Sequence, residues 1–166
     1  MGQIIISLLV FAVWLASYWI DTAVLGYSDS SKAYTRLTYI FAHASFFHMA
    51  MNLFAFNMLM RSVRKLKLKI PLITAILASS IGTFFATYSI PTVGLSGVCF
   101  ALLGALLVKI HNRDFMISVG IVLIAQWITF IINSNVNVPL HISSLIIGFI
   151  LTYLFNYDYK RTKEGR

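Results

Sequence analysis

Long apolar stretches, separated by short polar or charged interruptions, follow one another along almost the whole chain. We predict six membrane-spanning helices from them, at residues 4–20, 39–60, 71–89, 95–110, 115–133 and 138–157. Neither an internal repeat nor a separate soluble region is visible in the pattern. The pattern therefore predicts an all-α membrane protein, a bundle of six transmembrane helices, in which residues 1–166 form a single domain.

The fourth apolar stretch is shorter than the others. From Leu95 to Ile110 it has about 16 residues, which at ~1.5 Å per residue span roughly 24 Å of a hydrocarbon core about 30 Å thick. We therefore expect this short fourth helix to start inside the membrane, with Ser96 near its beginning. Irregular backbone at that depth is tolerated only against protein or a water-filled cavity, so residues 92–96 are predicted to face an internal aqueous pocket.

The composition narrows the class of protein and its location in the cell. Hydrophobic residues make up 59% of the chain and charged residues 11%, which excludes a water-soluble domain with one buried core. The first apolar stretch lacks the basic start and the small-residue cleavage pattern of a removable signal peptide, so we expect a retained anchor. No transit-peptide pattern precedes it, and this minimal multi-pass form favours a bacterial plasma membrane.

The formal net charge of +8 is concentrated beside three of the predicted spans. Eleven of the 13 Lys and Arg residues follow the second, fourth and sixth spans: Arg61, Arg64, Lys65, Lys67, Lys69, Lys109, Arg113, Lys160, Arg161, Lys163 and Arg166. By the positive-inside rule both termini are cytoplasmic, and the odd-numbered spans run outward. Basic residues beside a membrane contact lipid headgroups, so we expect membrane lipids as partners and no nucleic acid.

This topology brings the polar residues of three spans to one depth. The second, fourth and sixth spans all begin near the outer side, where they carry His43, His48, Asn52, Ser96 and His141. His48 and Asn52 are four positions apart and therefore share one face of a helix. A polar side chain that faces lipid is costly, so all five are expected to point into the bundle.

Each of these residues also has a purely structural interpretation. Gly94, Ser96, Gly97 and Gly104 fit a small-residue helix-packing pattern, and an intramembrane His or Asn commonly forms hydrogen bonds between helices. Cys99 is expected to be buried and inert, because the chain has one cysteine and no disulfide partner for it. The combination of the polar residues at one depth, and no single residue, favours a functional site.

The chemistry that fits this combination is nucleophilic catalysis. A serine at a helix N-terminus is a weak nucleophile and needs a base within about 3 Å, for which His141 is the candidate. All five carboxylates lie in loops or tails, so a Ser–His dyad without an acidic third member is predicted, its imidazole held by packing. Asn52, His48 and the Ser96 backbone N–H are candidate donors to an oxyanion. No metal and no cofactor is expected.

Three segments resemble the rhomboid family of intramembrane serine proteases, and the resemblance covers all six predicted spans. His43-Ala-Ser-Phe-Phe-His48-Met-Ala-Met-Asn52 is similar to the second-helix pattern of that family. Gly94-Leu95-Ser96-Gly97, followed by Phe100 and Gly104, is similar to its Gly-x-Ser-Gly helix, and His141 to Gly148 is similar to its sixth helix. The resemblance implies a rhomboid-like fold with Ser96 and His141 catalytic. It also implies that the following residues support the site: His43, His48, Asn52, Gly94, Leu95, Gly97 and Phe100.

The same resemblance implies a substrate and a gate. The substrates would be transmembrane proteins, cut near the outer leaflet after a small residue, at a point where the substrate helix can unwind. The gate would be the loop 133–138 together with the neighbouring part of the fifth helix. The oligomeric state is not determined by any of these patterns.

Four positions depart from the family pattern. Arg36 stands two residues after Tyr34 instead of beside it. Phe100, one helical turn below Ser96, replaces the usual Tyr and keeps the aromatic ring that would stack on the His141 imidazole. Ser144 and Leu140 are larger than the residues the family often has there, so the fourth and sixth helices are expected to lie slightly further apart.

Three other functions compete with proteolysis. A catalytically silent rhomboid-like protein would bind transmembrane helices without cutting them, although the presence of both Ser96 and His141 argues against it. A transporter or proton relay would use the three membrane histidines. A haem or metal site would use His48 and His141 as neutral ligands.

Overall fold

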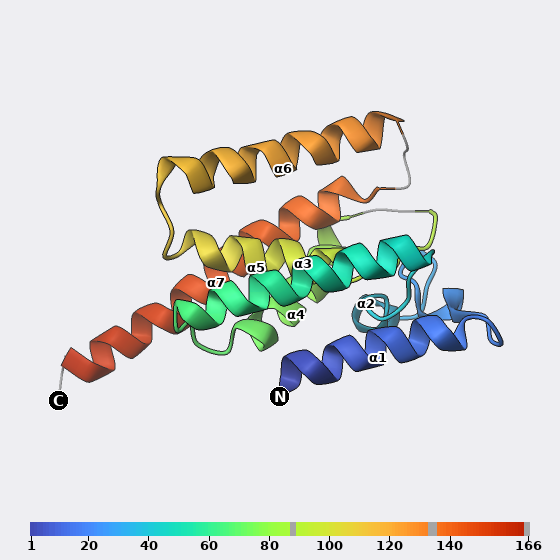
Figure 1. Ribbon diagram of the computed structural model, residues 1–166, viewed down its shortest axis with the longest axis horizontal. Coiled ribbons are helices and arrows are strands. Elements are labelled where there is room, and N and C mark those ends of the chain that lie inside the picture. Colours follow the sequence, from blue (N-terminus) through green and yellow to red (C-terminus); the bar gives the residue numbers. More distant parts are fainter. Residues whose placement is uncertain (87–88, 133–135, 165–166) are drawn as a thin grey trace.

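The computed structural model describes residues 1–86, 89–132 and 136–164, and these residues form helices and connecting loops without a strand (Figure 1). Six longer helices follow the order of the six predicted segments. The elements are α1 (Gly2–Ala16), η1 (Thr22–Leu25), α2 (Thr35–Thr38), α3 (Phe46–Lys65), α4 (Pro71–Gly82), η2 (Thr83–Phe85), α5 (Ser96–Leu107), α6 (Arg113–Ile132) and α7 (Val138–Glu164).

The second long helix begins later than predicted. The predicted span starts at residue 39, but α3 starts at Phe46 because Ser45 caps it: its backbone is extended and its Oγ accepts a hydrogen bond from the His48 N–H at 3.1 Å. The segment before this cap is a single helical turn, α2, followed by irregular backbone. His43 therefore lies in the loop that leads into α3, outside the helix.

Other boundaries also differ from the predicted ones. The first helix ends at Ala16 instead of residue 20, and α7 continues to Glu164. The helix that begins at Ser96 has 12 residues and is about 18 Å long at ~1.5 Å per residue, even shorter than predicted. The predicted end at residue 89 directly follows residues 87–88, and the predicted end at residue 133 lies within residues 133–135. The structure does not describe either of these two segments.

Two helices are long and apolar enough to cross a membrane by length and composition, namely Arg113–Ile132 and the part of α7 from Val138 to Asn156. The apolar segments Gly2–Ala16, Pro71–Phe85 and Ser96–Leu107 are shorter than a typical span. Helix α3 has 20 residues but includes His48, Asn52 and a basic last turn.

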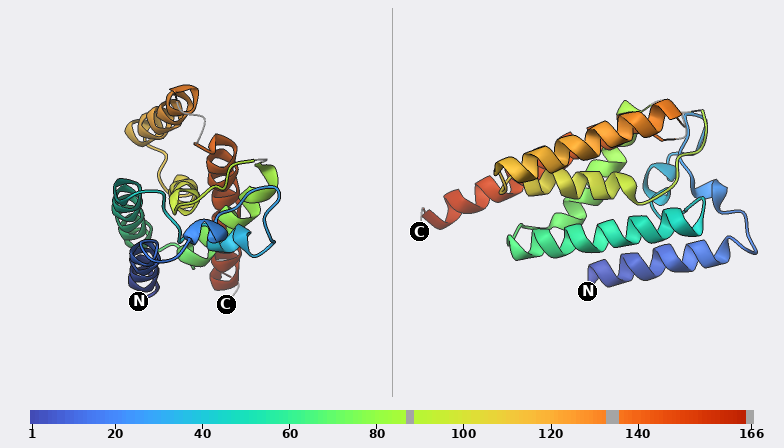
Figure 2. Two further views of the ribbon diagram at one scale, coloured as in Figure 1. Left: turned by 90° about the vertical axis from the view of Figure 1, so that its right-hand side faces the viewer. Right: turned by 45° about the horizontal axis from the view of Figure 1, so that its top comes forward.

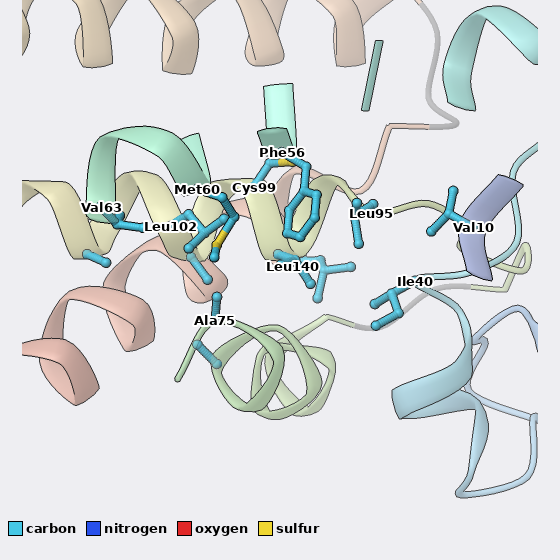
Figure 3. Close-up of a cluster of buried hydrophobic side chains, with 14 of the residues drawn as sticks. Val10, Ile40, Phe56, Met60, Val63, Ala75, Leu95, Cys99, Leu102 and Leu140 are labelled. Carbon is cyan, nitrogen blue, oxygen red and sulfur yellow. The ribbon is translucent and has the colours of Figure 1, made fainter. Parts of the chain in front are cut away.

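The helix α5 lies at the centre of the bundle, in contact with α3, α4 and α7, while α1 packs against α3. The apolar core lies between these helices and includes Phe56 and Met60 of α3, Leu102 of α5 and Leu140 of α7 (Figure 3). Helix α6 stands apart from the other long helices in Figure 1 and in the left view of Figure 2. Among its described residues Val119 alone is buried.

Two glycines allow α5 and α7 to approach closely. A Cβ at Gly148 would lie 2.7 Å from the Ala101 Cα, and a Cβ at Gly104 would lie 3.0 Å from the backbone N of Phe149. The wider spacing expected from Ser144 is therefore not found. Its side chain is buried next to Gly82 of α4, whose Cβ would lie 2.8 Å from the Ser144 Oγ.

Large apolar side chains cover much of the outer surface. They include Leu8 and Phe11 on α1, Ile124 and Ile131 on α6, and Leu154 on α7. Soluble monomers rarely expose continuous apolar patches larger than a few hundred Å². A surface of this kind is suited to contact with lipid tails.

Candidate active site

The first residue of α5 and the first turn of α7 meet at one end of the bundle. Ser96 is the N-terminal residue of α5, as the sequence predicts, and its Oγ lies 2.8 Å from Nε2 of His141. Both helices begin at the same end of the molecule, so their first turns lie at one level (Figure 1). This distance is suitable for transfer of the hydroxyl proton to the imidazole.

The His141 imidazole has two further neighbours. The Phe100 ring is stacked on it, with centroids 4.5 Å apart and planes inclined by 10°. Its Nδ1 lies 2.7 Å from Oε1 of Gln126 on α6. The sequence predicts the stacking but assigns the imidazole to packing alone, so the hydrogen-bonding partner corrects that expectation.

The backbone before Ser96 is held by His43 and lies directly against His48. The Nε2 of His43 accepts a hydrogen bond from the Leu95 N–H at 3.2 Å, and its Nδ1 lies 3.2 Å from the Phe41 carbonyl oxygen. Nε2 must therefore carry the lone pair, so Nδ1–H donates to Phe41. Gly94 has φ +121°, and a Cβ there would lie 2.8 Å from Cε1 of His48. The site thus requires glycine at this position both for its conformation and for space.

Asn52 is close to the site but does not line its cavity. Its Nδ2 donates to the His48 carbonyl oxygen at 3.0 Å, and only 8% of the residue is exposed. A Cβ at Gly94 would lie 3.5 Å from this nitrogen, so the amide lies close to Gly94. The structure therefore brings all five predicted polar residues into one cluster, with Asn52 outside the cavity lining.

A cavity of about 590 Å³ opens over the serine and the histidine. Its lining residues come from the loops and from α3, α5, α6 and α7: Ala44, His48, Ile90, Pro91, Thr92, Val93, Ser96, Gln126, Val136, Asn137 and His141. A second cavity of about 420 Å³ adjoins it, and the two share Ala44, Pro91 and Val93. Ser17 and Asp21 line the second cavity, so polar groups continue outward from the site.

The loop above the cavity is braced by Thr92. Its backbone exchanges two hydrogen bonds with Tyr27, at 2.9 and 2.7 Å, and its hydroxyl accepts a bond from Asn137 Nδ2 at 3.0 Å. Asn137 also caps α7, because its Oδ1 accepts a bond from the Leu140 N–H at 3.1 Å. Thr92 thus connects the loop after η1, the loop before Ser96 and the start of the helix that carries His141.

Arg36 of α2 connects the loop after η1 to η2. Its guanidinium lies 4.7 Å from the centroid of the Tyr27 ring and 4.0 Å from that of Phe84, and its Nη1 donates to Thr83 Oγ1 at 2.8 Å. These contacts, two of them cation–π, link the loop to the segment that follows α4. The spacing of this Arg, which departs from the family pattern, still allows it to hold the loop.

Gly97 lets α5 pack against the buried hydroxyls of two neighbouring elements. The Tyr39 hydroxyl and the Ser79 Oγ form a hydrogen bond there, and a Cβ at Gly97 would lie 2.6 Å from that Tyr39 oxygen. Cys99 is a free, buried thiol, and its Sγ lies 3.7 Å from the Asn52 carbonyl oxygen.

The described part of the chain contains no group of three or more His, Cys, Asp or Glu side chains placed to hold a metal ion. Sequence reasoning placed residues 92–96 at the pocket and residues 133–138 at the gate, but it missed Gln126 and the hydrogen bond between Thr92 and Asn137. A signal for Gln126 was available, because a polar side chain within an apolar span is costly and usually faces the interior. Nothing in the local sequence marks the bond between Thr92 and Asn137.

Comparison with known families supports the resemblance that the sequence indicates. The family model described as the Rhomboid domain matches residues 30–158, which cover α2 to most of α7. No significant match is found among curated proteins. Because the matched region includes both Ser96 and His141 and most of the chain, this membrane protein belongs to the rhomboid family.

Proposed function

We propose that this protein is an intramembrane serine endopeptidase that cuts transmembrane segments with a Ser96–His141 dyad. The observation that carries the proposal is the distance of 2.8 Å between the Ser96 Oγ and the His141 Nε2, at the wall of a cavity that His48, Gln126 and Asn137 also line. Membership of the rhomboid family, whose members are generally serine proteases that act on transmembrane substrates, supports the same reaction.

In the first step the imidazole acts as a general base. Nε2 of His141 takes the proton of the Ser96 hydroxyl while Oγ attacks the carbonyl carbon of the scissile peptide bond. The imidazolium then gives this proton to the nitrogen of the leaving amine, and an acyl-enzyme remains. Water from the cavity, activated by the same histidine, hydrolyses the ester and restores the serine.

The tetrahedral intermediate carries an oxyanion that needs donors. The Ser96 backbone N–H is at the start of α5, where helix geometry leaves the first amides without partners in the helix. His48 lines the cavity and can supply a second donor. We assign Asn52 a weaker role, because its amide does not line the cavity and uses one N–H to bond the His48 carbonyl.

The proposed topology follows the distribution of charge. The six longer helices lie in the membrane, with α5 starting inside it, and the single domain comprises residues 1–166. Both termini are cytoplasmic, and the cavity opens toward the outer side of a bacterial plasma membrane. A helix as short as α5 can take part because the cavity, and not lipid, meets its N-terminal end.

Substrates are proposed to enter beside α6. This helix buries little of its surface in the described structure, and the loop that follows it includes residues 133–135, which lie outside the description. Disulfide crosslinks between cysteines introduced in α3 and α6 would test this route, in a background in which the buried Cys99 is replaced by Ala. Unchanged cleavage after crosslinking would exclude it.

The decisive experiment compares wild type, Ser96→Ala and His141→Ala side by side. Each is purified and given a model single-span substrate with a helix-weakening Gly or Pro near its outer end, and each is labelled with a fluorophosphonate. Cleavage and labelling by wild type alone would support the dyad. Cleavage by Ser96→Ala would contradict it. If wild type neither cuts several substrates nor takes the label, a silent helix-binding protein is the better description.

A further inference from the structure

Gln126 interrupts an otherwise apolar stretch of α6. The side chain is half-buried and lines the same cavity as Ser96, and its Oε1 lies 2.7 Å from Nδ1 of His141. A side-chain amide within an apolar span is costly unless its hydrogen-bonding groups are satisfied inside the protein. Here the partner is the imidazole that faces Ser96.

This contact determines which nitrogen of His141 carries the proton. A neutral imidazole has one N–H, and Nε2 must be unprotonated to take the proton of Ser96, from which it lies 2.8 Å away. An amide oxygen can only accept a hydrogen bond, so with Oε1 facing the ring the proton lies on Nδ1. The three side chains thus form one directed line of hydrogen bonds.

We infer that Gln126 is a positioning residue that holds His141 in the tautomer required of a base; the inference rests on the proposed function. During attack on the substrate, the proton moves from Ser96 Oγ to Nε2 and later to the leaving amine. The Nδ1–H stays bonded to Oε1 throughout, and Gln126 neither takes nor gives a proton. Its neutral amide orients the ring in the place where other serine proteases use a carboxylate.

The location of Gln126 gives the contact a second consequence. His141 belongs to α7, which packs closely against α5, whereas α6 has Val119 as its one buried residue within the described part (Figure 2). The hydrogen bond therefore connects the base to the least buried helix of the bundle. Displacement of α6 away from α7 breaks this bond, so the dyad is fully oriented only when α6 is in place.

The test replaces Gln126 by residues that keep its length. Gln126→Met removes the acceptor, while Gln126→Glu keeps an oxygen acceptor at the same position. Thr129→Val is the matched control, because it also removes a polar group from α6 and the Thr129 hydroxyl donates to the carbonyl oxygen of Ala125 in its own helix, at 2.8 Å. We measure kcat, KM, the rate of fluorophosphonate labelling and the unfolding temperature of each.

We expect the variants to differ in kcat and in the rate of labelling. Gln126→Met lowers kcat and the labelling rate about tenfold while KM changes by less than about twofold, as expected from loss of one neutral hydrogen bond. Gln126→Glu restores both rates to within about threefold of wild type, and Thr129→Val has no effect. Unchanged or faster cleavage by Gln126→Met would overturn the inference, and so would an equal loss in Gln126→Glu.

A spectroscopic measurement separates this inference from the proposed function. The chain has four histidines, so ¹⁵N-histidine NMR is tractable, with the His141 signals assigned by their loss in His141→Ala. We expect the proton on Nδ1 in wild type and a shift toward Nε2 in Gln126→Met. A proton on Nε2 in wild type would overturn the inference even in an active enzyme. An inactive wild type with the expected tautomer would contradict the proposed protease function but not the role of Gln126 in setting the tautomer.

Discussion

The Nε2 of His43 accepts a hydrogen bond from the backbone N–H of Leu95, the residue directly before Ser96, at 3.2 Å. Leu95 is completely buried, so its N–H has no access to solvent. A loop residue ahead of α3 thereby holds the backbone from which α5 begins. His43 supports the site through the main chain and does not line the cavity over Ser96.

Removal of this acceptor is expected to destabilise the protein. His43→Ala leaves the Leu95 N–H unpaired, which costs about 1–3 kcal/mol. The temperature of unfolding in detergent measures the effect, and the rate of cleavage is expected to fall with it. His111→Ala is the control, because His111 is exposed in the connection between α5 and α6. Equal stability of the two variants would show that the bond contributes nothing.

Loss of the ring stacked on His141 is expected to slow the reaction modestly. A stacked pair contributes about 0.5–1.5 kcal/mol, so Phe100→Ala lowers kcat about two- to twelvefold. Phe100→Tyr keeps the ring and is expected to match wild type. The comparison of kcat for the three proteins decides the role of the ring, and a loss in Phe100→Tyr equal to that in Phe100→Ala would refute it.

An alanine at Gly94 is expected to damage the site severely. The φ of +121° disfavours any L-residue, and the added Cβ would lie 2.8 Å from the His48 ring. We expect Gly94→Ala to lower cleavage at least about tenfold through displacement of His48. Gly120→Ala on α6 is the matched control, since no atom lies within 4 Å of its Cβ. Full activity of Gly94→Ala would contradict the proposed role of this backbone.

The two candidate oxyanion donors on α3, His48 and Asn52, are expected to contribute differently to kcat. Loss of one oxyanion donor costs on the order of 10² to 10³ in kcat, and we expect this loss in His48→Ala because His48 lines the cavity. Asn52→Ala is expected to lower kcat less, since the Asn52 amide does not line the cavity and bonds to the His48 carbonyl oxygen. We would measure kcat for both single variants and for the double variant. A greater loss of kcat in Asn52→Ala than in His48→Ala would contradict the prediction.

A methyl group between α5 and α7 is expected to lower stability. The Cβ in Gly148→Ala would meet the Ala101 backbone at 2.7 Å, and overpacking of this kind costs about 1–3 kcal/mol. Thermal unfolding of Gly148→Ala beside Gly120→Ala measures the difference. Because α7 carries His141, cleavage should fall in the same variant, whereas a stable and active protein would show that the helices can separate freely.

The sequence alone determined the order of the helices and the start of the helix that carries Ser96, but several other helix ends differ from the prediction. Apolar runs and the charges that interrupt them predicted six long helices in order, and Ser96 was predicted at the start of the fourth. Motifs with fixed spacing also indicated the rhomboid family, which the domain match supports. These features are local, because each depends on residues that are neighbours along the chain.

The tertiary structure decided how the helices are turned toward one another. Helix α6 is apolar on nearly all sides apart from Gln126, so its sequence indicates that this side chain faces the interior but does not identify His141 as its partner. Asn52 shares a helix face with His48, as predicted, yet its amide bonds to the His48 carbonyl oxygen and does not line the cavity over Ser96. Such contacts depend on the rotation and separation of helices that are distant in sequence, and the packing of the whole bundle determines both.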